Sequence, residues 1–320
     1  MYHVYFFGFK FSLNPIAFTL PIGKNGWDVY WYGIIIALGF LLAIIYGIKN
    51  AKTFNIDVDK MMDVALVTTP LAILCARTYY VIFDGEKITS VTDFFGFKNG
   101  SGFSGLAIYG GVIGAFVIGA LMCFIRKVNI LDMFDIGAIG FLIGQGIGRW
   151  GNFVNQEAYG AFTGSNWWGM QSSRTILEQG MGLVHPCFLY ESIWCLLGAF
   201  LLHKFSKNRK FSGQIALMYG VWYGFGRAII ELLRTDSLML GVFKVSCLLS
   251  ILLCLICGAV LMVVLSKVRA NSGEYVLIYD DAVSVDEDEE NLQETEMQEV
   301  SDNESVICEC DDSVTEDKDV

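Results

Sequence analysis

Long apolar segments dominate this chain and limit the folds that are open to it. Hydrophobic residues make up 54% of the sequence and charged residues 17%, unlike an average soluble domain. Several segments approach the ~20 residues that a membrane-spanning helix requires. The predicted spans are 29–48, 64–83, 103–125, 136–150, 188–202, 215–233 and 245–265. The sequence therefore predicts an all-α, polytopic membrane protein with about seven transmembrane helices.

The distribution of basic residues predicts how these helices are oriented. An odd number of spans places the two ends of the chain on opposite sides of the membrane. The loops on one side carry eleven Lys and Arg residues, against seven on the other side. Under the positive-inside rule, we expect the N-terminus outside and the C-terminus inside. The longest connecting segment, 151–187, then lies outside. We see no removable signal peptide and expect the first span to act as an uncleaved insertion signal.

A strongly acidic segment follows the last predicted span. Residues 1–270 hold 21 basic and 14 acidic residues, a net charge of +7. Residues 271–320 hold one basic and 19 acidic residues, a net charge of −18, and the two values add to −11. This segment has too few large apolar residues to offset the entropy of ordering, so we expect a disordered acidic cytoplasmic tail. Its simplest role is to remain solvated, and partner binding is the alternative.

Ionisable side chains inside the apolar segments are the strongest functional signal. Such groups are expensive at membrane depth, so they indicate a functional site. The segment 148–160, GRWGNFVNQEAYG, ends a glycine-rich run and contains Arg149, Asn152, Asn155 and Glu157. An arginine bonds pairs of oxygen atoms through its planar guanidinium group, as phosphate recognition requires. This segment therefore predicts a site for an anionic lipid that bears a phosphate.

Other polar residues in the apolar segments add to this set. Tyr223, Arg227 and Glu231 recur every four residues, so they share one helix face, where Arg227 and Glu231 can also pair with each other. Arg77 is a third arginine within an apolar span. In the segment 185–192, HPCFLYES, a carboxylate near the start of a helix interacts well with the helix dipole.

Structural explanations and other functional classes remain open. An arginine near a span end can reach the interface, and closely spaced glycines let helices pack. A transporter or flippase with an arginine-lined path for anions or lipids would also place polar residues in several spans. We find no paired half-spans, which counts against it. A non-catalytic scaffold or receptor does not explain three arginines in apolar spans.

The nine cysteines do not predict a metal centre or a disulfide framework. Most of them lie in or beside apolar spans, where cysteine behaves as a small hydrophobic residue. Cys254 and Cys257 have the spacing of a redox or metal pair, but no histidine or charge lies nearby in sequence. Cys187 follows His185, which could activate a catalytic thiol, although a loop contact explains the pair more simply.

Four motifs, in order along the chain, resemble the prolipoprotein diacylglyceryl transferase family. They are GLAIYGG at 105–111, GRWGNFVNQEAYG at 148–160, HPCFLYES at 185–192 and YGFGRAIIELLRTD at 223–236. The resemblance extends from about residue 31 to about residue 236. It implies a seven-helix bundle in the bacterial cytoplasmic membrane, with residues 1–270 as the transmembrane catalytic domain and a site that faces the outer side. No metal or organic cofactor is expected.

The resemblance also implies a reaction. Enzymes of this family transfer the diacylglyceryl group of phosphatidylglycerol to the lipobox cysteine of a prolipoprotein, the first step of lipoprotein maturation. The implied partners are phosphatidylglycerol, signal peptides with a lipobox and the lipid bilayer, and no nucleic acid. The thiolate attacks a glyceryl carbon. Arg149 and Arg227 would clamp the phosphate and stabilise charge as it develops.

The candidate site residues come from these motifs. By similarity, matches to functional positions of the family occur at Tyr32, Tyr109, Asn152, Glu157, Gly160, Tyr223 and Arg227. The predicted catalytic residues are Arg149, Arg227, Tyr109, Glu157 and Asn152. The predicted binding residues for phosphatidylglycerol are Arg149, Tyr32, Asn155, Gly160, Tyr223 and Arg77.

Tyr109 departs from the pattern of the family. Some members carry a histidine at this position, viewed as the proton acceptor, whereas a tyrosine with a pKa of about 10 is a poor base at neutral pH. Glu157, Glu231 and His185 are other candidates for the acceptor. A cationic site that favours the thiolate form of the substrate is a further possibility.

Overall fold

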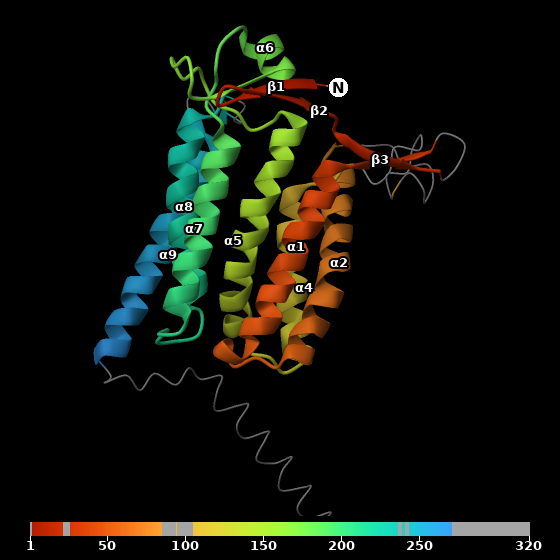
Figure 1. Cartoon of the computed structure of the whole chain (residues 1–320). Helices are drawn as coiled ribbons and strands as arrows, with labels where there is room; N and C mark the ends of the chain where they lie inside the picture. Colours follow the sequence, from red (N-terminus) through yellow and green to blue (C-terminus); the bar gives the residue numbers. More distant parts are fainter. Residues whose placement is uncertain are drawn as a thin grey trace, which may run out of the picture. The chain divides into compact units, whose positions relative to one another are not determined.

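Long helices form the body of the protein (Figure 1). The computed structural model describes residues 2–21, 26–84, 94, 105–235, 239–240 and 243–270. Within these residues the long helices are α1 (Trp31–Asn50), α2 (Val58–Asp84), α4 (Ile108–Ile125), α5 (Ile130–Asn155), α7 (Cys187–Ser206), α8 (Gln214–Leu233) and α9 (Val245–Ala270). Six of them are long and apolar enough to cross a membrane, and α8 falls outside this group. The all-α polytopic membrane class is confirmed, whereas the number of spans and their orientation stay predictions.

The helix boundaries correct several of the predicted spans, and α4 begins at Ile108 rather than at residue 103. We expected a short fourth span at 136–150, but α5 is 26 residues long. Asn129 caps its start by accepting hydrogen bonds from the backbone of Leu131 and Asp132. α2 begins earlier than predicted because Asp57 accepts hydrogen bonds from the backbone N–H groups of the first turn. The start of the predicted third span, residues 103–104, and the acidic tail, 271–320, lie outside the described residues.

Short strands, which we did not predict, occur near one end of the bundle. They are β1 (Tyr2–Phe6), β2 (Phe9–Leu13), β3 (Ile16–Leu20), β4 (Trp27–Tyr30), β5 (Met170–Ser172), β6 (Met239–Leu240) and β7 (Phe243–Lys244). They form antiparallel sheets in the orders β2-β1-β5, β3-β4 and β6-β7. The segment 151–187 thus has its own structure, since it contributes β5 and the short helix α6 (Ser173–Gln179). Pairing of β1 with β5 attaches this segment to the N-terminal hairpin.

A large buried apolar cluster includes residues of the short 3-10 helix η1 (Ala51–Phe54), at the opposite end of the bundle. Phe54 and Ile139 are fully buried there, within a large apolar cluster. Asp135 of α5 is also fully buried, and it accepts hydrogen bonds from the backbone N–H groups of Gly213 and Ala216. It also pairs with Arg209 Nη1 at 3.1 Å. This polar network ties α5 to the α7–α8 turn.

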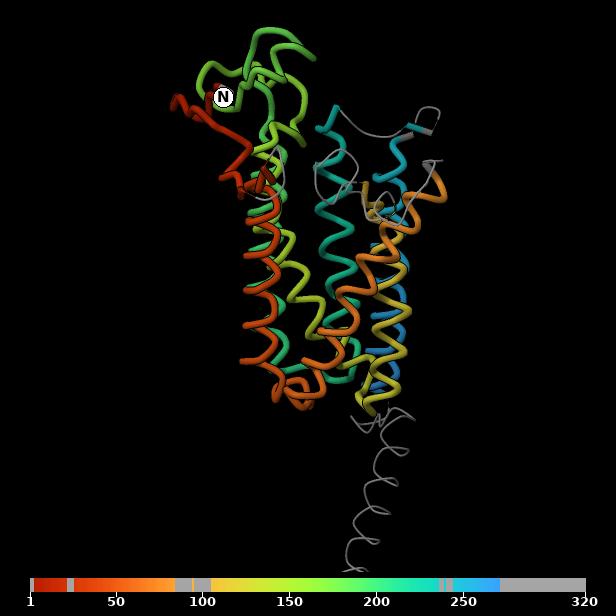
Figure 2. The backbone as a smooth tube through the Cα atoms, turned by 90° about the vertical axis from the view of Figure 1, so that its right-hand side faces the viewer, coloured from red at the N-terminus to blue at the C-terminus, as the bar shows by residue number. Residues whose placement is uncertain are grey.

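The helix pairs separate toward the other end. α1 packs chiefly on α5, and α2 chiefly on α4. A Cβ atom on Gly39 of α1 would lie 3.2 Å from the Gly144 carbonyl oxygen of α5, so this pair is in close backbone contact. Figure 2 shows α2 inclined to α1, with the two helices near each other at η1 and apart at the far end. Residues of α1, α2, α4 and α5 line the pocket described below.

Candidate active site

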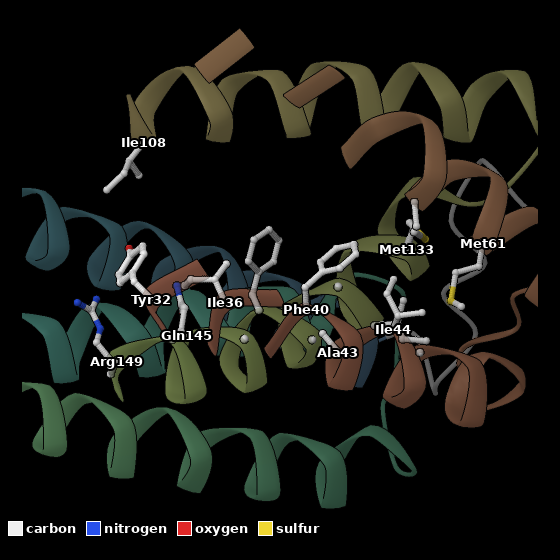
Figure 3. A pocket seen from close by; sticks show the side chains of 18 of the residues that line it. Tyr32, Ile36, Phe40, Ala43, Ile44, Met61, Ile108, Met133, Gln145 and Arg149 are labelled. Carbon is white, nitrogen blue, oxygen red and sulfur yellow. The ribbon is translucent and has the colours of Figure 1, made fainter. Parts of the chain in front are cut away.

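A groove of about 590 Å³ lies among α1, α2, α4 and α5. In Figure 3, Met61 and Met133 lie at one end, whereas Tyr32 and Arg149 lie at the other. We call the space the α1–α5 groove. The lining residues between its ends are mainly apolar or glycine: Ile36, Phe40, Ala43, Ile44, Gly47, Ile136, Gly137, Gly140, Phe141, Gly144 and Gly148. A long apolar space with a cationic end suits an anionic lipid.

Arg149 belongs to an ion-pair cluster that joins α5, α7 and α8. Its Nε atom lies 2.5 Å from Glu191 Oε2, and Arg227 pairs with the other oxygen of the same carboxylate. Arg227 Nη2 also lies 2.7 Å from Glu231 Oε2. Arg234 Nη1 is 4.0 Å from an oxygen of each glutamate. Both carboxylates are almost fully buried. We call these five residues the arginine–glutamate cluster.

The sequence predicted that Arg149 and Arg227 meet at an anion, and the structure brings them together at Glu191. The predicted alternative, a pair between Arg227 and Glu231, is also present. We missed the central position of Glu191. Buried arginines require counter-charges, so a carboxylate within an apolar segment was the signal that could have identified it.

The cluster concentrates guanidinium groups at one site. Those of Arg149, Arg227 and Arg234 lie around the carboxylates of Glu191 and Glu231. Burial strengthens the attraction of a guanidinium group for an anion, because the surroundings screen it less than water does.

The rest of the 148–160 segment lies between this cluster and the outer strands. Asn152 lines the groove, and Asn155 is the last residue of α5. Glu157 is half-exposed and lies 3.5 Å from Arg174 Nη1 of α6. Arg174 Nε also pairs with Glu178, on the same helix, at 2.9 Å. The contact between Arg174 and Glu157 ties α6 to the loop that carries Glu157. Hydrogen bonding to Glu178 raises the pKa of Arg174 above its ordinary value.

Gly160 stands where three chain segments meet. Its N–H group donates to the His185 carbonyl oxygen at 2.8 Å, and it forms an isolated bridge with Arg234. A Cβ atom there would lie 2.7 Å from the Leu233 carbonyl oxygen. Only glycine fits this backbone approach without a shift. The packing explains the residue type, and substrate binding by Gly160 stays a prediction.

The three candidate tyrosines occupy different surroundings. Tyr32 lines the groove near Arg149 (Figure 3). Tyr223 is partly buried and stacks on Tyr219, with 5.6 Å between the ring centroids. Tyr109 lies in the first turn of α4 and is 56% exposed, next to Ile108, which lines the groove. Their catalytic and binding roles stay predictions.

Arg77 has partners that explain its burial without a lipid. Its side chain donates to the carbonyl oxygens of Phe94 at 2.5 Å and Gly105 at 3.0 Å. The guanidinium group also lies over the Tyr80 ring. Arg77 is 1% exposed, and it does not line the α1–α5 groove. In the structure, Arg77 holds the segment that precedes α4 against α2.

The histidine and cysteines near the site have ordinary environments. His185 Nδ1 lies 3.1 Å from Tyr190 Oη, as in the predicted loop contact. Cys187 is buried at the first position of α7. Across the described part of the chain, no group of three or more His, Cys, Asp or Glu residues is arranged to hold a metal ion.

Comparison with known proteins identifies a family. Residues 15–264 match the family described as Prolipoprotein diacylglyceryl transferase. A phosphatidylglycerol–prolipoprotein diacylglyceryl transferase of Clostridioides difficile is 40% identical over 261 residues, which cover 81% of this chain and 98% of that protein. The Finegoldia magna protein of the same name is 40% identical over 264 residues, covering 82% of this chain and all of that protein. The Clostridium novyi protein is 37% identical over 265 residues.

Proposed function

The chain belongs to the prolipoprotein diacylglyceryl transferase family, and we propose that its arginine–glutamate cluster binds the phosphate of the donor lipid. The protein is a bacterial membrane enzyme that transfers the diacylglyceryl group of phosphatidylglycerol to the cysteine thiol of a prolipoprotein. One observation carries the proposal. Arg149 and Arg227, from two helices, meet at one carboxylate beside the cationic end of an apolar groove.

The charge of the cluster suits this lipid. A phosphodiester carries one negative charge, which guanidinium groups attract, and three of them lie together in this cluster. We expect its oxygens to share Arg149 and Arg227 with Glu191, or to replace Glu191 at one of them. The acyl chains then extend into the apolar part of the groove. Asn152 and Tyr32 line the same end and are positioned to orient the headgroup.

The cluster stabilises the leaving group in the proposed reaction. The thiolate sulfur attacks the glyceryl carbon, a C–S bond forms, and the C–O bond to the phosphate breaks with its electron pair on oxygen. Guanidinium groups already held in place require little reorganisation as this charge develops. Glu191 and Glu231 maintain their positions when lipid is absent. We propose that Glu157 and Tyr109 orient the incoming peptide or the headgroup.

The structure bears on the open question of the proton acceptor. Glu231 pairs with Arg227, Glu157 pairs with Arg174, and His185 contacts Tyr190. Each of these groups thus already has a partner within the protein. We propose that the guanidinium groups of the cluster favour the thiolate form of the substrate cysteine, which releases its proton to solvent before attack.

A reconstituted assay tests the function. Purified protein is mixed with phosphatidylglycerol vesicles and a lipobox peptide, and mass spectrometry follows the peptide. We expect a mass gain of one diacylglyceryl group on the cysteine, together with release of glycerol phosphate. A peptide with serine in place of that cysteine is the matched control. No mass gain with an inserted, folded enzyme would refute the proposal.

A further inference from the structure

Two tryptophans join the neighbouring helices α7 and α8 (Figure 1) through a reciprocal pair of hydrogen bonds. The indole N–H of Trp194 donates to the Trp222 carbonyl oxygen at 3.0 Å. The indole N–H of Trp222 donates to the Trp194 carbonyl oxygen, also at 3.0 Å. The two rings are stacked, with 4.3 Å between their centroids. We call this arrangement the tryptophan clasp. It lies in the interior of both helices, so the usual role of tryptophan at a membrane surface does not explain it.

A glycine on each helix makes room for the clasp. Gly198 follows Trp194 by four residues, and Gly226 follows Trp222 by four. A Cβ atom on Gly198 would overlap the Trp222 indole, and one on Gly226 would overlap the Trp194 indole. In an α-helix, a carbonyl oxygen accepts from the N–H group four residues later, so a side chain at either glycine would cover the oxygen that the indole uses. Each helix therefore repeats the same pattern and receives the indole of the other.

The clasp determines the register of α7 against α8. Within α7, Glu191 precedes Trp194 by three residues, or about 4.5 Å along the helix. Within α8, Arg227 follows Trp222 by five residues, or about 7.5 Å. Glu191 pairs with Arg227, so the two helices run antiparallel. A shift of α7 by one residue would move each indole N–H about 1.5 Å from its acceptor, and would move Glu191 as far relative to Arg227.

The ion pairs of the arginine–glutamate cluster hold the same register only while phosphate is absent. In the proposed function, phosphate oxygens share Arg227 with Glu191 or replace Glu191 there. Either event weakens the ionic link between α7 and α8. The tryptophan clasp contains no charged group, and neither of its tryptophans lines the α1–α5 groove. Phosphate should therefore leave the clasp intact.

We propose that Trp194 and Trp222 are positioning residues, which keep Glu191 and Arg227 in register while lipid phosphate displaces the ion pair between them. The inference rests on the proposed function, because it requires the donor phosphate to bind at the arginine–glutamate cluster. A misplacement of about 1 Å can lower the rate of a positioned reaction by ~100-fold. Loss of the clasp should therefore lower the rate of the chemical step more than it weakens lipid binding.

The test measures kcat and KM for phosphatidylglycerol in the reconstituted assay, per amount of folded and inserted enzyme. Trp194→Phe, Trp222→Phe and the double variant keep aromatic rings but remove the indole donors. Gly226→Ala disrupts the clasp by a second route, because its methyl group displaces the Trp194 indole. Trp167→Phe changes an exposed tryptophan outside both helices and is the matched control. Asp135→Asn is the control for lost stability, since its contacts are remote from the arginine–glutamate cluster.

The expected result is a fall in kcat without a matching rise in KM. The double phenylalanine variant should lose at least about tenfold in kcat, because the guanidinium groups no longer meet the leaving phosphate in one fixed geometry. Its KM for phosphatidylglycerol should stay within about twofold of the wild type. Gly226→Ala should give the same signature. Each single phenylalanine variant retains one hydrogen bond of the clasp and should lose less. Asp135→Asn should lower Tm without this fall in kcat.

Three outcomes would overturn the positioning role. They are a normal kcat in the double variant, a rise in KM alone, or an equal fall in kcat in Asp135→Asn. The last result would attribute the loss to general destabilisation. If the double variant does not fold, the single variants and Gly226→Ala are judged by the same criteria. A wild-type enzyme inactive in the assay refutes the proposed function itself. An active wild type with normal kcat in the clasp variants refutes only the role of the clasp.

Discussion

Arg149 of α5 and Arg227 of α8 contact the two oxygens of one carboxylate, that of Glu191 in α7. Two guanidinium groups this close repel each other unless an anion lies between them. Glu191 supplies that anion from within the protein, and Glu231 supplies a second one to Arg227. The helices can therefore fold around a site that is ready for phosphate. Because breaking a buried ion pair is costly, the arrangement should persist when lipid is absent.

The first prediction concerns the two arginines. Arg149→Gln and Arg227→Gln should each lower the rate of diacylglyceryl transfer by about 100- to 1,000-fold, because each removes a charged donor from the leaving phosphate. The rate is measured per amount of inserted protein with a lipobox peptide. Arg126→Gln is the control, since Arg126 forms an exposed pair with Asp63. Near-normal turnover in both variants would contradict the role assigned to the cluster.

The second prediction concerns Glu191. Glu191→Gln should destabilise the protein by up to about 3–5 kcal/mol, because it removes the buried carboxylate that the two partly buried arginines share. Phosphatidylglycerol should restore part of this loss, so the rise in Tm on adding lipid should be larger than in the wild type. Asp63→Asn removes an exposed carboxylate and serves as the control. Equal lipid-induced rises in all three proteins would show that lipid phosphate does not occupy this position.

The third prediction separates stability from chemistry. Asp135 lies fourteen residues before Arg149, about 21 Å away along α5. Asp135→Asn should lower Tm, because Arg209 loses one of its two charged partners and two backbone N–H groups lose a charged acceptor. The kcat of the folded fraction should stay within about twofold of the wild type, since the network is remote from the groove's cationic end. A large fall in kcat without a fall in Tm would show that the network acts on catalysis.

The fourth prediction concerns the acidic segment. Deletion of residues 275–320 should leave transfer activity intact, because the segment lies beyond the last helix of the catalytic domain and outside the family match, which ends at residue 264. The truncated and full-length enzymes are compared in the same vesicle assay. Loss of activity in a truncated protein that keeps its Tm would instead assign the acidic segment a role in substrate delivery.

The sequence alone determined the class of protein and most of its helices. Long apolar segments predict spanning helices because the hydrophobic requirement is local, and α1, α7, α8 and α9 begin within two residues of their predicted starts. α5 was underestimated because Asp132 and Asp135 interrupt its apolar pattern. Those charges are tolerated only because Arg209 approaches from the α7–α8 turn. The sequence pattern of α5 cannot show that contact, because Arg209 lies in a distant segment of the chain.

The tertiary structure alone decided which residues meet. The sequence indicated that Arg149 and Arg227 need an anion, but the rotation and packing of three helices place Glu191 between them. The tertiary structure also places Arg77 against the backbone that precedes α4, outside the groove. The apolar content of a segment predicts that it forms a membrane helix. Which other helices it contacts depends on the shape and charge of segments that are distant in the sequence. That is why motifs predicted the chemistry, and only the packed helices revealed the groove.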